Sequence, residues 1–180
     1  MKMKTITNLV SIGLVLGFAL LPQLSNAQKI TQKTTNIKIT GTSPMHDWEM
    51  TGSTATFAGT IAGNAITNVT FNVPIKTIKA EKGKTMEKKA YDALKADKTP
   101  NITFSAPTLS VGKSNVTGKL TIAGVSKNVN FPVNVAKKGN SYVIDGSESI
   151  KLSEFGMDRP GFMGIKTGDV VTVKVNIVAE

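Results

Sequence analysis

Apolar and polar residues alternate through most of this sequence. In segment 129–135 every second residue is Val or Phe, and the residues between them are Asn or Pro. Segments 69–75 and 171–177 alternate in the same way. Successive side chains of a β-strand point to opposite faces, so each segment reads as a strand with one face buried. A chain built largely from such segments is restricted to an all-β fold.

Short turn sequences separate the alternating segments. Gly63-Asn64, Ala123-Gly124 and Gly139-Asn140 are residue pairs typical of tight turns. Neighbours joined by such short connections pair as antiparallel hairpins, so the sequence predicts an up-and-down meander. The predicted strands cover residues 30–40, 46–60, 65–76, 101–110, 114–123, 127–137, 141–151 and 169–179.

One segment departs from this pattern. Between Lys84 and Asp97 the apolar residues recur at the spacing of an amphipathic helix. Lys88 and Asp92 stand four residues apart, which adds weak support for a surface helix. A helix inserted into a meander either caps an open end of a barrel or covers an edge of the sheet.

About eight strands are enough for a sheet to close on itself. An eight-stranded barrel is either filled by its own side chains or holds one small ligand. The alternating faces consist mainly of Val, Ile, Ala and Thr, which leave more of the interior unfilled than a wall of Phe and Trp would. A barrel with an internal cavity is therefore the prediction, and a β-sandwich with a packed core is the alternative.

The first 27 residues have the features of a secretory signal. Lys2 and Lys4 precede an apolar stretch at 9–21, and small residues follow at 25–27. The apolar stretch is too short for a stable membrane span. We expect cleavage after Ala27 and a periplasmic or secreted domain over residues 28–180; an uncleaved anchor is the competing interpretation. A domain of this size builds a core without disulfides, and the chain has no cysteine.

The chain is basic, with 22 Lys and Arg against 12 Asp and Glu. Such an excess suggests nucleic acid, an anionic membrane surface or a phosphorylated ligand as a partner, or simply a solvated strand face. Nucleic acid is the poorest of these candidates. Export separates the protein from it, and arginine, the preferred reader of bases, occurs once, at Arg159.

Residues that perform chemistry are scarce. His46-Asp47-Trp48 is the one cluster that suggests catalysis, because a His beside a carboxylate could act as a base with its orienting partner. Adjacent residues of a strand point to opposite faces, however, so the two side chains are not expected to meet. No cysteine and no Gly-x-Ser-x-Gly serine accompanies it, and one histidine does not make a zinc site. We therefore predict no enzyme, no metal and no cofactor. His46 either forms local hydrogen bonds or meets the polar end of a ligand at the barrel mouth.

Two groups of cations have alternative roles. Arg159, in the loop 158–164, either contacts a phosphate or carboxylate or forms a salt bridge with Asp158 or Glu154. Lysines that precede and enter the helix either contact an anionic headgroup or form a solvated face; they are Lys79, Lys82, Lys84, Lys88 and Lys89.

Four motifs in order resemble the YceI family of exported, lipocalin-like proteins. The first is Gly41-Thr42-Ser43 followed by His46-Asp47-Trp48, and the most recognisable is the stretch 89–104. Segments 118–127 and 164–171 are similar to two further family segments. The resemblance spans nearly all of residues 28–180.

The resemblance implies an elongated antiparallel β-barrel that holds a polyisoprenoid, such as an isoprenoid quinone or a prenyl phosphate. Family members are periplasmic or secreted, often dimeric, and act as lipid-binding proteins. The competing function is a ligand-free interaction or stress-protective protein with a packed core. His46 and Arg159 are the predicted headgroup contacts. Strand parity selects the predicted lining, which is Trp48, Phe57, Phe71, Val73, Phe104, Leu120, Phe131, Val133 and Val173.

Overall fold

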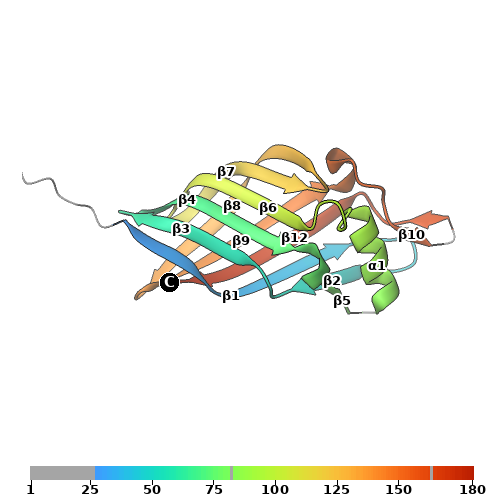
Figure 1. Ribbon diagram of the computed structural model, residues 1–180, viewed down its shortest axis with the longest axis horizontal. Helices are drawn as coiled ribbons and strands as arrows, with labels where there is room; N and C mark the ends of the chain where they lie inside the picture. The colour runs from blue at the N-terminus through green and yellow to red at the C-terminus, as the bar shows by residue number, and fades with distance from the viewer. Residues whose placement is uncertain (1–26, 82, 163) are drawn as a thin grey trace, which may run out of the picture.

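Antiparallel strands close into an elongated barrel in the computed structural model, which describes residues 27–81, 83–162 and 164–180 (Figure 1). The predicted signal segment 1–27 lies, except for Ala27, outside the described residues. The barrel strands are β1 (Gln28–Gly41), β2 (Trp48–Gly52), β3 (Thr56–Ala62), β4 (Ala65–Pro74), β6 (Asn101–Ser110), β7 (Gly112–Ile122), β8 (Val125–Lys138), β9 (Ser141–Lys151) and β12 (Val170–Ala179).

Strands that follow one another along the chain are neighbours in the barrel. The order runs β1, β3, β4, β6, β7, β8, β9 and β12, and β12 pairs with β1 to close the ring. Because β2 and β3 occupy one position in this ring, the barrel has eight strand positions. The predicted eight-stranded up-and-down barrel is confirmed, and the two-sheet sandwich is not the fold.

The predicted strand over 46–60 is wrong in detail, because the chain interrupts it. β2 and β3 both pair with β1 in one continuous register, with Gly52 opposite Ile37 and Ala58 opposite Thr31. At the break, the side-chain oxygen of Gln32 accepts the backbone N–H of Phe57 at 2.7 Å. A side chain thus replaces a ladder bond, so the backbone leaves the sheet without losing register.

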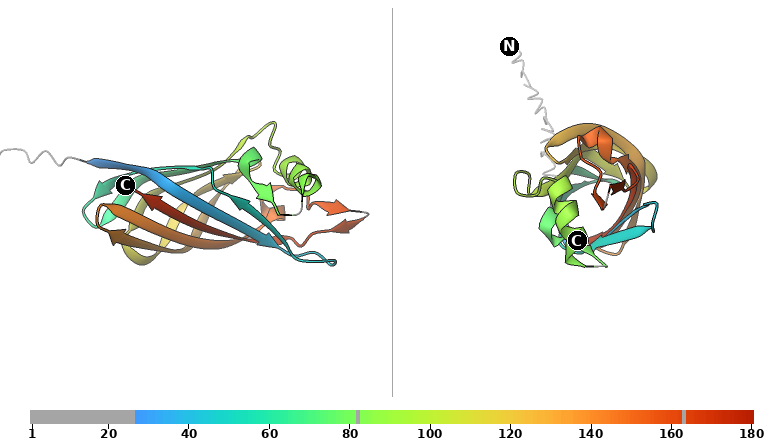
Figure 2. Two further views of the ribbon diagram at one scale, coloured as in Figure 1. Left: turned by 90° about the horizontal axis from the view of Figure 1, so that it is seen from below. Right: turned by 90° about the vertical axis from the view of Figure 1, so that its right-hand side faces the viewer.

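The two ends of the barrel differ. The hairpin end carries the β3–β4, β6–β7 and β8–β9 turns, and the helix end carries α1 (Lys84–Ala93) (Figures 1 and 2). At the helix end, Ala123 and Gly124 join β7 to β8 with φ of 50° and 82°. Two successive positive φ angles fit the twist of a tight hairpin, which explains the Ala-Gly pair.

Helix α1 ends at Ala93, four residues before the predicted limit at Asp97. Lys95 adopts a left-handed conformation with φ of 55°, and the N–H of Ala96 bonds to the carbonyl of Tyr91 at 2.9 Å. This is a left-handed C-terminal cap, made here by Lys where Gly is more usual. Among the described residues, no helix is long and apolar enough to span a membrane.

Short elements complete the helix end. They connect the barrel strands and fold over or beside the opening, as Figure 2 shows. They are η1 (Ile75–Thr77), β5 (Lys79–Ala80), η2 (Leu152–Phe155), β10 (Gly161–Phe162) and β11 (Ile165–Lys166).

The core fills the hairpin end more completely than the middle of the barrel. Val135, Ile66 and Ala179 have no exposed surface, and Tyr142 is 2 % exposed. Phe71, Phe104 and Phe131, nearer the middle, are only partly buried although they belong to the same apolar cluster. Inward-facing side chains that remain accessible indicate unfilled space inside the barrel.

Candidate functional site

A cavity of about 160 Å³ lies inside the barrel. All eight strand positions contribute to its wall, which is almost entirely apolar. The wall also contains aliphatic residues that were not selected from the sequence. Those on the barrel strands keep the alternation of the selected residues, except Leu109, which has the opposite parity to Phe104 on β6. They are Ile37, Ile39, Val69, Ile78, Ile102, Leu109, Val116, Ile122, Ile144, Ile150, Val175 and Ile177.

Eight of the nine predicted lining residues contribute to this wall: Phe57, Phe71, Val73, Phe104, Leu120, Phe131, Val133 and Val173. Trp48 does not, because its indole lies over the backbone of Gly41 at the helix end and its Nε1 donates to the carbonyl of Thr42 at 3.3 Å. The role of all nine residues in ligand binding stays a prediction.

Two inward-facing glycines shape the cavity. A Cβ atom on Gly118 would lie 2.4 Å from the ring of Phe104, so this ring packs directly on the Gly118 backbone. A Cβ atom on Gly146 would meet only the ring of Phe131, at 3.5 Å, which is an ordinary contact. Gly118 thus makes room for a wall residue, whereas Gly146 leaves space that no side chain fills.

One ionisable residue belongs to the cavity wall, and the sequence analysis missed it. Glu148 lines the cavity between Gly146 and Ile150 on the inward face of β9. Its exposure is intermediate. Within 141–151, Glu148 has the same parity as Ile144 and Ile150, so alternation places it on the inward face. The predicted lining omitted it because that lining contained only apolar residues.

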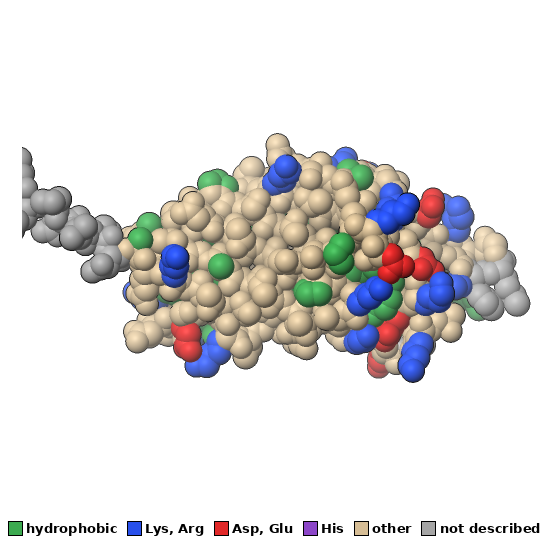
Figure 3. All heavy atoms as spheres, in the orientation of Figure 1, with side chains coloured by type: hydrophobic (Ala, Val, Ile, Leu, Met, Phe, Trp, Pro, Cys, Tyr) green, Lys and Arg blue, Asp and Glu red, His purple; other side chains and the backbone are tan. Residues whose placement is uncertain are grey.

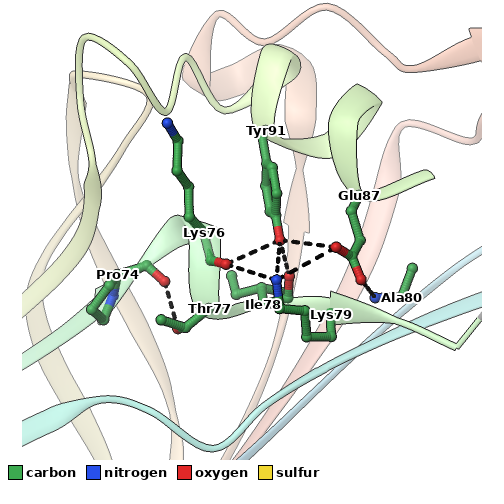
Figure 4. Close-up of polar contacts among 8 residues, drawn as sticks. All are labelled: Pro74, Lys76, Thr77, Ile78, Lys79, Ala80, Glu87 and Tyr91. Atoms are coloured by element: carbon green, nitrogen blue, oxygen red, sulfur yellow. Dashed lines mark hydrogen bonds and ion pairs between the residues drawn. The ribbon is translucent and has the colours of Figure 1, made fainter. Parts of the chain in front are cut away.

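Helix α1 covers part of the helix end and is held there by polar contacts (Figure 4). Its Met86 and Ala90 pack against the apolar cluster around Ile78. The Tyr91 hydroxyl donates to the carbonyl of Ile78 at 2.6 Å, and Glu87 accepts the backbone N–H of Ala80 at 3.3 Å. The helix therefore caps one end of the barrel, which was one of the two expected roles.

Lys79 joins this contact from the strand side (Figure 4). Its Nζ lies 3.2 Å from the Tyr91 hydroxyl and 3.5 Å from the Glu87 carboxylate. The hydrogen bond with Tyr91 and the nearby Glu87 charge raise the pKa of Lys79 above its ordinary value. The ammonium group therefore stays charged while it links α1 to the chain that follows β4.

Element η2 closes a second part of the same end. Phe155, 1 % exposed, packs with Ile122 and Ala123 beside the β7–β8 turn. Asp169 holds the start of η2: its two carboxylate oxygens accept the Ser153 N–H at 2.9 Å and the Ser153 hydroxyl at 2.6 Å. These bonds lower the pKa of the Asp169 carboxyl.

The predicted headgroup residues lie at the outer rim of the helix end. His46 lines a surface hollow between α1 and the β10–β11 hairpin, and its Nδ1 lies 2.9 Å from the Asp47 carbonyl. Arg159 is exposed and its guanidinium donates to the Thr167 carbonyl at 3.5 Å. Within the described chain Arg159 forms no ion pair, and Glu154 pairs instead with Lys127 at 3.7 Å.

Charged side chains gather over α1 and the neighbouring β5 (Figure 3). Lysines and acids are interspersed there rather than segregated. Lys76 pairs with Asp97 and Lys88 with Asp92, both at 2.7 Å, and the second pair has the predicted spacing of four residues. Such exposed pairs add little stability individually. Lys82 lies outside the described residues.

A closed eight-stranded barrel with an internal apolar cavity defines a class of proteins whose barrel interior has room for one small ligand. The YceI-like domain family matches residues 28–179, and the chain belongs to this family. No curated protein matches the chain.

Solved structures share the fold. The chain is similar to BcnA of Burkholderia cenocepacia, with 22% identity, a TM-score of 0.68 and coverage of 81% of this chain and 96% of that chain. A polyisoprenoid binding domain from Saccharophagus degradans, implicated in plant cell wall breakdown, gives 12% identity, a TM-score of 0.68 and coverage of 84% and 97%. The YceI protein of Campylobacter jejuni is 20% identical, with a TM-score of 0.54 and coverage of 98% of this chain and 97% of that chain.

Proposed function

We propose that this protein binds a polyisoprenoid lipid, with the tail inside the barrel, and carries or stores it outside the cytoplasm. The observation that carries the proposal is the internal cavity, whose wall is aliphatic and aromatic apart from one stretch of β9. Family membership and the similarity to a polyisoprenoid binding domain support it. The signal-like segment 1–27 supports a periplasmic or secreted location.

The energetics of burial favour such a ligand. Each buried methylene contributes about 0.8 kcal/mol, and micromolar affinity needs about 8 kcal/mol. Some ten methylene equivalents supply this before the costs of ordering the ligand are subtracted. A few isoprene units therefore provide the driving force. We expect the tail to lie toward the hairpin end and the polar end to lie toward the helix end, where polar groups and solvent are accessible.

Filling the cavity tests the proposal directly. Gly146→Leu adds a side chain on the inward face where a Cβ atom has room, so we expect the added atoms to extend into the space of the ligand. Replacing Gly within a strand also removes a destabilising residue, worth roughly 0.5–1 kcal/mol. We expect folding to be retained and binding of farnesol or of lipids co-purifying from the native host to be lost, as measured by native mass spectrometry.

Thr70→Leu is the matched control, because Thr70 is exposed on the barrel strand β4. It adds similar apolar surface outside the cavity and should leave lipid binding unchanged. Equal binding by wild type and Gly146→Leu would place the lipid elsewhere and contradict the proposal. Failure of the wild type to bind any prenyl lipid would favour the competing function, a ligand-free protein with a packed interior.

A further inference from the structure

Glu148 is an anomaly in the cavity wall. It faces inward from β9 between Gly146 and Ile150, and Val173 of β12 lies opposite it in the ladder. Among the described residues, no group donates a hydrogen bond to its carboxylate and no cation pairs with it. Glu148 is of intermediate exposure, and it is the one charged residue in a wall that is otherwise almost entirely apolar. Packing therefore gives no reason for an acid at this position.

The barrel wall changes beside Glu148. The β8–β9 ladder begins at the hairpin end and stops at the pair Val133–Gly146. Beyond it, residues 147–151 pair only with β12 and residues 125–132 only with β7, as far as the structure describes these strands. Glu148 thus lies where two adjacent strands have parted, on the helix-end side of the last paired residues.

An outer groove adjoins the cavity at this place. The two share four wall residues, and Gly146, with no side chain, lies between two of them on adjacent strands. A polar group at Glu148 is therefore close to solvent, while a tail that starts there extends toward Ile144 and the hairpin end. The shared residues are Val133, Gly146, Ser147 and Val175.

Resting on the lipid-binding function above, we propose that Glu148 binds the ligand's polar end and selects headgroups that donate a hydrogen bond and carry no negative charge. A carboxylate only accepts hydrogen bonds, so it recognises a hydroxyl or amine donor. It repels a phosphate because both groups are negatively charged. A prenol or a prenyl hydroquinone fits this site, and a prenyl phosphate does not.

Three ligands with one tail separate these effects: farnesol, farnesyl methyl ether and farnesyl phosphate. Wild-type protein should bind farnesol about tenfold or more tightly than the ether, the size expected for a hydrogen bond to a charged acceptor. It should bind the phosphate most weakly. Glu148→Leu should abolish the preference for the alcohol over the ether, and Glu148→Gln should strengthen phosphate binding by about tenfold because the repelling charge is gone.

Asp158→Asn is the control, because it makes the same change in net charge at an exposed residue outside the cavity wall. Its ligand preferences should equal those of the wild type. Thermal unfolding verifies that the Glu148 variants fold, and we expect them to be at least as stable as the wild type. If the Glu148 variants bind the three ligands with the same relative affinities as the wild type, this inference is wrong, but the proposed lipid-binding function still stands. If the wild type binds none of the three ligands, both the lipid-binding function and this inference fall.

Discussion

At the scale of single residues, Gly118 and Gly146 test how tightly the barrel wall is packed. Both face inward, but a Cβ atom on Gly118 would lie 2.4 Å from Phe104 and 2.6 Å from the Ser105 carbonyl oxygen. Gly118→Ala should therefore push the Phe104 ring toward the cavity and shift the adjacent backbone, at a cost of roughly 1–3 kcal/mol in the free energy of unfolding. Urea unfolding measures this cost.

Gly146→Ala is the paired control for this prediction, because its new Cβ atom would meet only Phe131 at ordinary contact distance. It should be neutral or slightly stabilising. Gly118→Ala should also weaken binding of a prenol, since Phe104 would occupy ligand space. Equal stabilities for the two variants would show that the wall at Gly118 yields more easily than its packing indicates.

Alternation predicts which side chains face inward, and this explains why eight of nine selected residues line the cavity. Trp48 belongs to the same parity but lies beyond the cavity, since β2 starts at the rim and the indole folds over Gly41. Gly118 and Glu148 were missed for a different reason. Their positions follow from parity, but an empty position or a charged wall residue becomes meaningful only once the opposite strands are known.

At the scale of elements, η2 depends on a titratable contact. The Asp169 carboxylate accepts two hydrogen bonds from Ser153, which lower its pKa below the ordinary value of 3.8. A lowered pKa means that this contact stabilises the folded chain above pH 3.8 and loses its effect as pH falls through the folded value. We expect amide hydrogen exchange in Leu152–Phe155 to quicken selectively on acidification.

Asp169→Ala should reproduce that acid behaviour at neutral pH, with faster exchange in η2 and little change in the β6–β7 hairpin. Mass spectrometry or NMR of exchanging amides distinguishes the two regions. Uniform acceleration across the barrel would indicate global destabilisation instead and would contradict a local role for Asp169.

The contact between α1 and the chain after β4 makes a second prediction at this scale. Tyr91→Phe removes the hydroxyl that donates to Ile78 and leaves the ring in place. A lost hydrogen bond of this kind costs about 0.5–1.5 kcal/mol. We expect α1 to open more often and a bound prenol to dissociate faster, measured by stopped-flow displacement. An unchanged dissociation rate would show that the ligand does not leave past α1.

Element types followed from the sequence more reliably than element limits. The helix was predicted from its periodicity, but Lys95 ends it in a conformation that Gly usually adopts. The break between β2 and β3 depends on the side chain of Gln32, which is distant in sequence from the strand that it interrupts. Such contacts exist only after the strands have paired, so local patterns do not contain them.

At the scale of the whole molecule, closure of the barrel brings the inward faces of eight half-buried strands around one interior. The strand count and turn lengths indicated a meander, whereas the pairing of β12 with β1 decides between a barrel and an open sheet. Closure also sets the size of the interior. A cavity of about 160 Å³ is close to the roughly 150 Å³ of an engineered apolar cavity that binds benzene. A longer tail therefore requires lining side chains such as Phe71, Phe104 and Phe131 to move apart.

The length of the cavity leads to a prediction about the length of the ligand's hydrocarbon tail. From Ile144 to Ile150 the cavity follows β9 for about 20 Å, which projects to roughly 15 Å along the axis of a barrel whose strands tilt by about 40°. Affinity should rise from geraniol to farnesol because each added isoprene unit buries more hydrocarbon. The further gain to geranylgeraniol should be smaller, because its tail exceeds the cavity.

Calorimetry measures these affinities, and a negative heat-capacity change that grows with tail length up to the same limit would identify apolar burial as the driving force. Phe71, Phe104 and Phe131 should show altered ring NMR signals in the complex, since they must move to admit the tail. Equal affinities for all three alcohols would mean that the tail stays outside the barrel. A continuous rise past geranylgeraniol would mean that the hairpin end opens, despite the close packing around Tyr142 and Val135.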